Sequence, residues 1–215
     1  MKILRIVGIA MALSLAFSYS TFTQTSNMSF FLTSMGPGDG ANLGGLDGAD
    51  RHCSLLASAA GAAGRTWRAY LSTSGGDELV NARDRIGEGP WYNAKGVMVA
   101  ENVEDLHSDN NKLSKTHSIS ETGEEINGRG DSPNRHDILT GSDLMGNTFS
   151  DGEDHSCADR TTNSSDGSAQ VGHHDRTGGG ANPTSWNNAH ASRGCGQSDL
   201  QGTGGDGLYY CFAID

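Results

Sequence analysis

Apolar residues recur at a helical spacing over residues 49–60 of this 215-residue chain. Ala49, Cys53, Leu56 and Ala60 follow one another at steps of four, three and four residues. That spacing places the four side chains on one face of a predicted helix. The helix would pack through this face, and the patterns that follow it predict its partners.

Both ends of the predicted helix carry recognisable signals. Asp47 is the expected N-cap, and Asp50, three positions later, would complete a capping box. Gly61 can adopt the left-handed conformation that ends a helix. Beyond it, residues 66–71 alternate between two sets of side chains, which predicts a strand whose Trp67 anchors the core.

Short apolar runs bounded by turn residues predict the other strands. A polar turn ending in Gly96 separates residues 90–92 from 97–99, which predicts a hairpin. The remaining predicted elements are strands within residues 29–34, 136–142 and 207–214, and a short helical turn within 81–86. The pattern predicts an α+β, loop-rich domain with short, mostly antiparallel strands and one or two helices.

Two long polar tracts interrupt these elements. Residues 101–135 are acidic and poor in large apolar side chains, which predicts a long surface loop outside the core. Residues 143–193 are dense in Gly, Asn, Asp, Ser and Thr, so they can bury little area and would need covalent support. We expect a single domain over residues 27–215.

The first residues are typical of a secretory signal peptide. Lys2 and Arg5 precede a short apolar run over residues 6–17, and small residues follow that run. The run is too short for a comfortable membrane span. We therefore assign residues 1–26 to a signal peptide and N-terminal linker, and expect a secreted or periplasmic protein that is not integral to a membrane.

Charge and motifs narrow the function further. Without Lys2 and Arg5 the chain carries 13 basic and 26 acidic side chains, a formal charge of −13. Such an acidic chain disfavours nucleic acid and anionic membranes as partners. It has neither a G-x-S-x-G elbow nor an H-E-x-x-H zinc signature. The sequence therefore favours a non-catalytic protein over an enzyme.

Four cysteines lie beyond the signal peptide: Cys53, Cys157, Cys195 and Cys211. An even number in an exported protein predicts two disulfides, and spacing alone leaves all three pairings open. A zinc site is the alternative, and the absence of any C-x-x-C pair disfavours it.

The order of these pieces resembles the endostatin-like branch of the C-type-lectin-like fold, and still more a set of bacterial secreted proteins with that fold whose role is poorly defined. The matching stretches are ADRHC (49–53) with RAYLS (68–72), GPWYN (89–93) with GV (96–97), LTGS (139–142) with Gly146, and Cys157, Cys195 and YYC (209–211).

The resemblance implies nested disulfides, in which Cys53 pairs with Cys211 and Cys157 pairs with Cys195. The chain departs from its relatives at Arg160, where they tend to carry Trp, and it lacks endostatin's basic heparin-binding surface. The fold implies lectin-like recognition of a glycan or another surface polymer. The alternative is a structural or protein-interaction module of the cell envelope or extracellular matrix.

A partial likeness to the calcium site of sugar-binding C-type lectins lies near the end of the second polar tract. Those proteins combine an x-P-x loop with Trp-Asn-Asp, and here NPT (182–184) precedes Trp186, Asn187 and Asn188. Asp175 could add a carboxylate, so these four residues are the candidate ligand-binding set and calcium is the candidate ion. In the alternative interpretation Trp186 is a core residue and the two asparagines are turn residues.

A second candidate site is the run His173, His174 and Asp175, the densest cluster of metal-ligand residue types. His155 or His190 could complete a zinc set, which would also allow a metal-dependent enzyme. The alternative is a solvated polar loop, because no H-x-x-x-H spacing predicts a preformed site.

The tripeptide RGD occupies residues 129–131 in the acidic tract. It has the form of a cell-adhesion motif, and its expected position in a loop would expose it. A three-residue match arises easily by chance, so no role follows from it.

Overall fold

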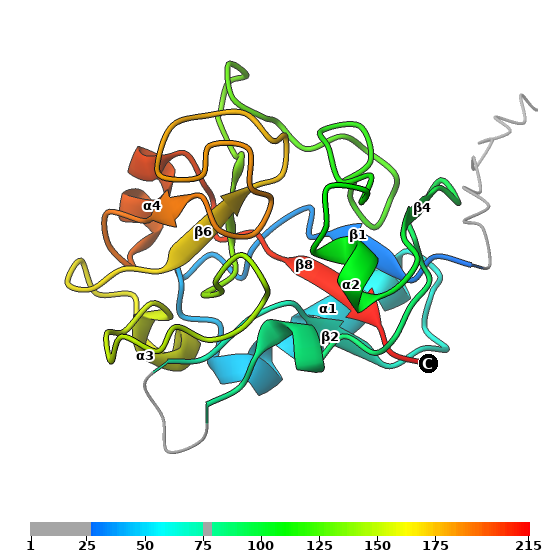
Figure 1. Cartoon of the computed structure of the whole chain (residues 1–215), viewed down its shortest axis with the longest axis horizontal. Helices are drawn as coiled ribbons and strands as arrows, with labels where there is room; N and C mark the ends of the chain where they lie inside the picture. Colours follow the sequence, from blue (N-terminus) through cyan, green and yellow to red (C-terminus); the bar gives the residue numbers. More distant parts are fainter. Residues whose placement is uncertain (1–26, 75–78) are drawn as a thin grey trace, which may run out of the picture.

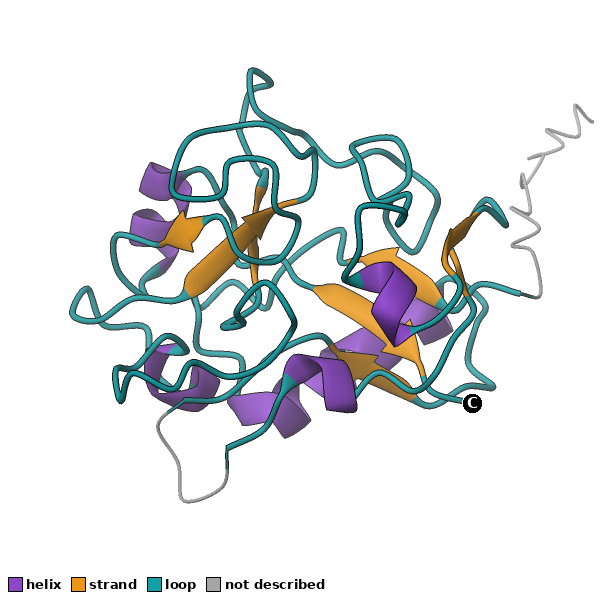
Figure 2. Cartoon of the chain, viewed as in Figure 1, coloured by secondary structure: helices purple, strands orange, loops and turns teal. Residues whose placement is uncertain are grey.

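A computed structural model describes residues 27–74 and 79–215 of the chain. The predicted signal peptide and linker at residues 1–26 lie outside the described residues. Loops make up most of the described chain, and short helices and strands are distributed among them (Figure 2). The expected α+β class with short antiparallel strands is confirmed.

The first sheet has the strand order β1-β8-β2 (Figure 1). β1 (Phe30–Leu32) and β2 (Trp67–Ala69) each pair antiparallel with β8 (Tyr210–Ala213), which lies between them. Helix α1 (Gly45–Ala59) packs against β2. The strands predicted near residues 29–34, 66–71 and 207–214 are therefore all present.

Both faces of this sheet are buried, because alternate side chains enter two different clusters. Phe31, Trp67 and Cys211 belong to the cluster beneath α1. Phe30 and Phe212 belong to the cluster on the opposite face, which also contains Tyr70 and Tyr210. Burying a large apolar side chain stabilises the fold by about 1.5–3 kcal/mol, so these aromatic residues hold the layers together.

A second sheet has the order β5-β6-β7. It consists of β5 (Asp137–Leu139), β6 (Gln170–His173) and β7 (His190–Ala191), all antiparallel neighbours. The Leu139 amide donates to Leu208 O at 2.9 Å, so the chain entering β8 runs beside β5. Helix α4 (Gln197–Thr203) lies at the outer side of this sheet, at the left in Figure 1.

The remaining elements are small. The predicted hairpin is present as β3 (Trp91–Tyr92) and β4 (Met98–Ala100). The predicted helical turn is a 3-10 turn, η1 (Ala82–Asp84). α2 (Val103–Leu106) follows the hairpin. Among residues 27–74 and 79–215, no helix is long and apolar enough to cross a membrane.

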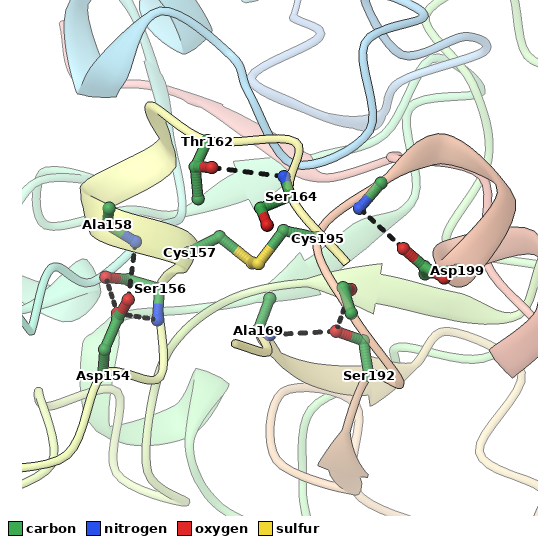
Figure 3. Close-up of a disulfide and its surroundings, with 12 residues drawn as sticks. Asp154, Ser156, Cys157, Ala158, Thr162, Ser164, Ala169, Ser192, Cys195 and Asp199 are labelled. Carbon is green, nitrogen blue, oxygen red and sulfur yellow. Dashed lines mark hydrogen bonds between the residues drawn. A yellow bond between two sulfur atoms is a disulfide. The ribbon is translucent and has the colours of Figure 1, made fainter. Parts of the chain in front are cut away.

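Both disulfides have the pairing that the resemblance implied. Cys53 in α1 bonds to Cys211 in β8, and Cys157 bonds to Cys195. The second bond begins in α3 (Cys157–Arg160), whose four residues have φ between 50° and 68° and form a left-handed turn. Left-handed turns cost about 1–2 kcal/mol per non-glycine residue, so the bond and the carboxylate of Asp154 are needed to hold this one (Figure 3).

Three expectations about local structure were wrong. α1 begins one turn earlier than predicted, after a left-handed Gly44, so Asp47 lies inside the first turn and is not the N-cap. Asp50 does not form the hydrogen bond of a capping box. Its carboxylate is buried and forms ion pairs with Arg68 and Arg85. α4 was not predicted, because Leu200 is its only buried residue.

The acidic tract 101–135 was expected outside the core, and this is also corrected. It is mostly irregular, but four of its apolar side chains are at most 6% exposed: Leu106, Leu113, Ile119 and Ile126. Three of them belong to the cluster around Tyr70 and Phe212. The tract is therefore part of the fold, because widely spaced single apolar residues fasten an otherwise polar segment to the core.

Candidate functional site

Trp186, predicted to bind ligand or pack in the core, lies within the aromatic cluster and is 3% exposed. Its ring lies 4.8 Å from that of Tyr70 and 5.4 Å from that of Tyr210, measured between centroids. Trp186 therefore occupies a core position in this structure, with its edge at the floor of the groove described below.

The two predicted asparagine ligands are also buried, and each has its own partners. Asn187 Nδ2 donates to Tyr70 Oη at 3.0 Å and to Asp143 O at 3.0 Å, while its Oδ1 accepts from Ser185 Oγ. Asn188 Oδ1 accepts from Gln170 Nε2 at 2.6 Å. Asn187 thus fixes the loop at residues 143–144 above the core.

Asp175, the fourth predicted ligand-binding residue, is held by its neighbours. Its Oδ2 accepts from the Arg129 amide at 2.6 Å, and its Oδ1 accepts from the Thr177 amide at 3.1 Å. Burial raises the pKa of this carboxyl, but His136 and the two amides lower it more, so the pKa lies well below its ordinary value. The Asp175 carboxylate and the side chains of Asn187 and Asn188 already bind other groups of the protein, so they do not form an open calcium-ligand set in this structure.

A groove of about 470 Å³ is lined by Trp186 and Asn187, but not by Asp175 or Asn188. Leu144 and Met145, which are 49% and 47% exposed, form an apolar rim. Asn111, Arg176 and Asn182 provide polar groups, and Arg176 Nη1 donates to Asn111 Oδ1 at 3.0 Å. The groove therefore combines apolar and hydrogen-bonding surfaces on loops fixed by the buried asparagine.

The predicted metal run His173-His174-Asp175 is divided by the structure. His174 Nε2 donates to Asn127 O at 3.1 Å, and its ring is buried, which lowers the pKa of His174. His155 is also separate, since it binds Asp151 at 2.9 Å. His173, by contrast, lies in β6 facing a different group of ligand-type residues.

That group forms at the end of the second sheet and includes His190, as the sequence allowed. The β5–β6 register places Asp137 opposite His173, and the β6–β7 register places His190 beside Val171. His136 precedes Asp137 at the start of β5. We call His136, Asp137, His173 and His190 the histidine cluster.

The histidine cluster converges on one atom. Asp137 Oδ1 lies 3.1 Å from His136 Nε2, 3.3 Å from His173 Nε2 and 3.5 Å from His190 Nε2. Burial raises the pKa of Asp137, but the facing imidazoles lower it more, and the net pKa lies below its ordinary value. The same carboxylate raises the pKa of His190.

Sequence reasoning found two of these four residues and missed His136 and Asp137. The dipeptide His-Asp at the start of a strand was a usable signal, because both are metal-ligand residue types. What the sequence could not show is that residues 137 and 173 are opposite each other in adjacent strands.

The RGD tripeptide is engaged within the protein. Asp131 Oδ2 binds Lys115 Nζ and accepts from the Gly128 amide at 2.8 Å. The Arg129 amide is the donor to Asp175 described above. The carboxylate of the motif is thus paired with a lysine of the same chain.

Comparisons with known proteins add no assignment: no protein-family model matches the chain, and no curated protein matches it.

Proposed function

We propose that this protein is a secreted, non-catalytic binding domain that holds a saccharide segment of a glycan or surface polymer in the groove around Arg176. The two disulfides are typical of proteins in an oxidising compartment, which is consistent with secretion. The binding role rests on the groove and on the resemblance to C-type-lectin-like proteins, since a fold alone does not fix a function.

The observation that carries the proposal is the composition of the groove walls. Sugar rings present C–H faces and hydroxyl groups, so they need apolar contact and paired donors and acceptors together. Leu144 and Met145 supply apolar contact, while Arg176 and Asn182 supply polar groups. Calcium has no part in this proposal, because Asp175, Asn187 and Asn188 already bind other groups.

The test is a glycan array probed with the wild-type protein and two methionine variants. Met145→Ala removes half of the apolar rim, and we expect about tenfold weaker binding, the equivalent of about 1.4 kcal/mol. Met35→Ala is the matched control, since Met35 is 59% exposed and does not line the groove. Equal binding by the two variants, or no glycan bound by the wild type, would refute the proposal.

The alternative is a protein-interaction module of the envelope or matrix. The exposed pair Leu144 and Met145 favours it, because apolar side chains at a rim also suit a protein partner. Two results together would identify this function instead. The wild type would bind no glycan, and its binding to a partner protein would be abolished by Met145→Ala but unchanged by Met35→Ala.

A further inference from the structure

We propose that the histidine cluster is a metal centre, in which His136, Asp137, His173 and His190 bind one divalent transition-metal ion, with zinc the best match. This site is separate from the groove and does not depend on what the groove binds. Three features support this assignment: a buried carboxylate that faces only imidazoles, an oxygen acceptor at each Nδ1, and the distances between the donor atoms.

The carboxylate of Asp137 requires a partner. Its side chain is 2% exposed, and the three imidazole Nε2 atoms, 3.1–3.5 Å from Oδ1, are the side-chain partners that it has among the described residues. Burying an unpaired carboxylate costs several kcal/mol, so such groups are normally paired or bound to metal ions. No lysine or arginine forms an ion pair with Asp137 in residues 27–74 and 79–215; the side chains that face its carboxylate are three histidines.

Each imidazole has an oxygen acceptor at Nδ1, and the His136 and His173 rings stack with their centroids 4.3 Å apart, so a shared ion would require one of these two rings to turn. His173 Nδ1 lies 2.8 Å from Pro183 O, His190 Nδ1 lies 3.1 Å from Ala191 O, and His136 Nδ1 lies 3.4 Å from Asp175 Oδ1. Carbonyl and carboxylate oxygens only accept, so each Nδ1 carries the proton. In the neutral ring Nε2 then keeps its lone pair, and all three Nε2 atoms face Asp137. Outer oxygen partners of this kind are typical of metal-binding histidines.

The distances from Asp137 Oδ1 to the three Nε2 atoms, and the distance between the His173 and His190 Nε2 atoms, are close to those of a tetrahedral zinc site. Zn–N bonds of about 2.0–2.1 Å at tetrahedral angles place neighbouring donors about 3.3 Å apart. The three Nε2–Oδ1 distances are 3.1, 3.3 and 3.5 Å, and His173 Nε2 lies 3.0 Å from His190 Nε2. Two imidazole lone pairs at 3.0 Å repel each other unless a cation or a proton lies between them.

Three members of the histidine cluster already form a compact group, and His190 is the fourth member. His136, Asp137 and His173 each offer a ligand atom within 4.8 Å of the others, and all three are buried. His190 is 24% exposed at its side chain, so it lies at the entrance. Three imidazoles with one carboxylate favour zinc over calcium or magnesium, which prefer all-oxygen sites.

Glycines allow the surrounding chain to approach the rings closely. A Cβ at Gly178 would lie 2.5 Å from His173 Cε1, and one at Gly204 would lie 3.2 Å from His136 Nε2. The loop that starts at Gly178 continues into the groove wall at residues 181–187. The metal centre is therefore adjacent to the loop that lines the groove.

The test uses tag-free, metal-stripped full-length protein, with bound zinc measured by mass spectrometry and affinity by titration calorimetry. We expect one zinc ion per chain and a higher melting temperature with zinc. Asp137→Asn and His173→Gln should each weaken zinc binding at least 100-fold, and His190→Gln should weaken it less. His52→Gln is the matched control, because His52 lies on α1 and binds Met35 O.

Asp137→Asn also tests whether a loss of zinc binding results only from unfolding of the variant. It removes the buried charge, so the metal-free variant should melt no lower than the metal-free wild type, while its zinc-dependent shift disappears. Cobalt(II) bound to the wild type should give the intense visible absorption of a tetrahedral site. A wild type that binds no zinc, or an Asp137→Asn variant that binds it as tightly as His52→Gln, would overturn the proposal and leave a shared proton as the group between the rings.

Discussion

Replacement of Asp50 by Ala should destabilise the protein strongly, because this one carboxylate of α1 serves three partners. Asp50 is 6% exposed and accepts from Arg68 Nη1 at 2.6 Å, Arg85 Nη2 at 2.8 Å and the Ala69 amide at 2.8 Å. One carboxylate therefore connects α1 to β2 and to the residue after η1. Its removal leaves two cations and one buried amide without their shared acceptor.

The magnitude depends on how far each partner can reach water instead. The Arg68 side chain is 40% exposed, so its bond contributes little beyond a surface ion pair, about 0–1 kcal/mol. The Arg85 side chain is 11% exposed, and losing the partner of a buried charge costs about 3–5 kcal/mol. The unpaired Ala69 amide adds about 1–3 kcal/mol. Because these costs overlap, we expect Asp50→Ala to lower the unfolding free energy by about 4 kcal/mol.

Urea denaturation of a small set of variants separates these contributions. Asp50→Asn keeps an acceptor for the Ala69 amide and should cost less than Asp50→Ala. Asp47→Ala is the matched control, since Asp47 is exposed on the same helix, and it should cost less than about 0.5 kcal/mol. In double-mutant cycles, coupling to Arg85 should exceed coupling to Arg68. Equal coupling, or a loss below 1 kcal/mol for Asp50→Ala, would refute the burial argument.

Three further predictions concern stability. Loss of the Cys53–Cys211 bond, which spans 158 residues, should lower the unfolding free energy by about 5 kcal/mol, and loss of the Cys157–Cys195 bond, which spans 38 residues, by about 4 kcal/mol. Denaturation of the two double-alanine variants would contradict this prediction if the second variant lost more stability than the first. A Cβ at Gly172 would lie 1.9 Å from Trp186 O, so Gly172→Ala should unfold or severely destabilise the protein, whereas Gly179→Ala, which meets nothing within 4 Å, should leave the melting temperature within a few degrees. Burial lowers the pKa of His107, whose Nδ1 donates to Val103 O and whose Nε2 accepts from Tyr70 Oη. The folded protein therefore favours the neutral His107 ring. This contribution to stability is complete at pH values above 6.5, the ordinary pKa, and is lost as the pH falls below 6.5. An NMR titration of the His107 ring with a midpoint above 6.5 would contradict this sign.

The sequence predicted the three strands of the first sheet and α1 because their signals are local, although it did not predict the order of the strands. Apolar residues at helical spacing identify α1, and alternation around Trp67 identifies β2. The start of α1 was misplaced because a left-handed Gly44 precedes it and no side chain caps it, so the usual capping signal is absent. Asp50 was given a capping role because its partner Arg85 lies 35 residues away.

The histidine cluster could be predicted only in part, because it depends on pairing between distant strands. Residues 137 and 173 meet through the β5–β6 register, and neither segment has the alternation of a half-buried strand. Similarly, Asn187 was an expected calcium ligand. The sequence does not distinguish an asparagine that binds an ion from one that fixes a loop by a hydrogen bond to Tyr70. Both errors concern what a polar side chain meets, which spacing along the chain does not encode.

The central position of β8 has a consequence for how the protein is made. β1 and β2 are synthesised early, yet in the described part of the chain each forms its sheet pairing only with β8, which follows β2 by more than 100 residues. While translation continues, their apolar side chains have no edge to bind, so the growing chain stays open and accessible to chaperones. Cys53 is likewise synthesised 158 residues before its partner Cys211. In that interval its thiol could form a non-native disulfide with Cys157 or Cys195. The first sheet is thus completed only once β8 has been made, and a chain released before residue 208 should show no cooperative unfolding transition.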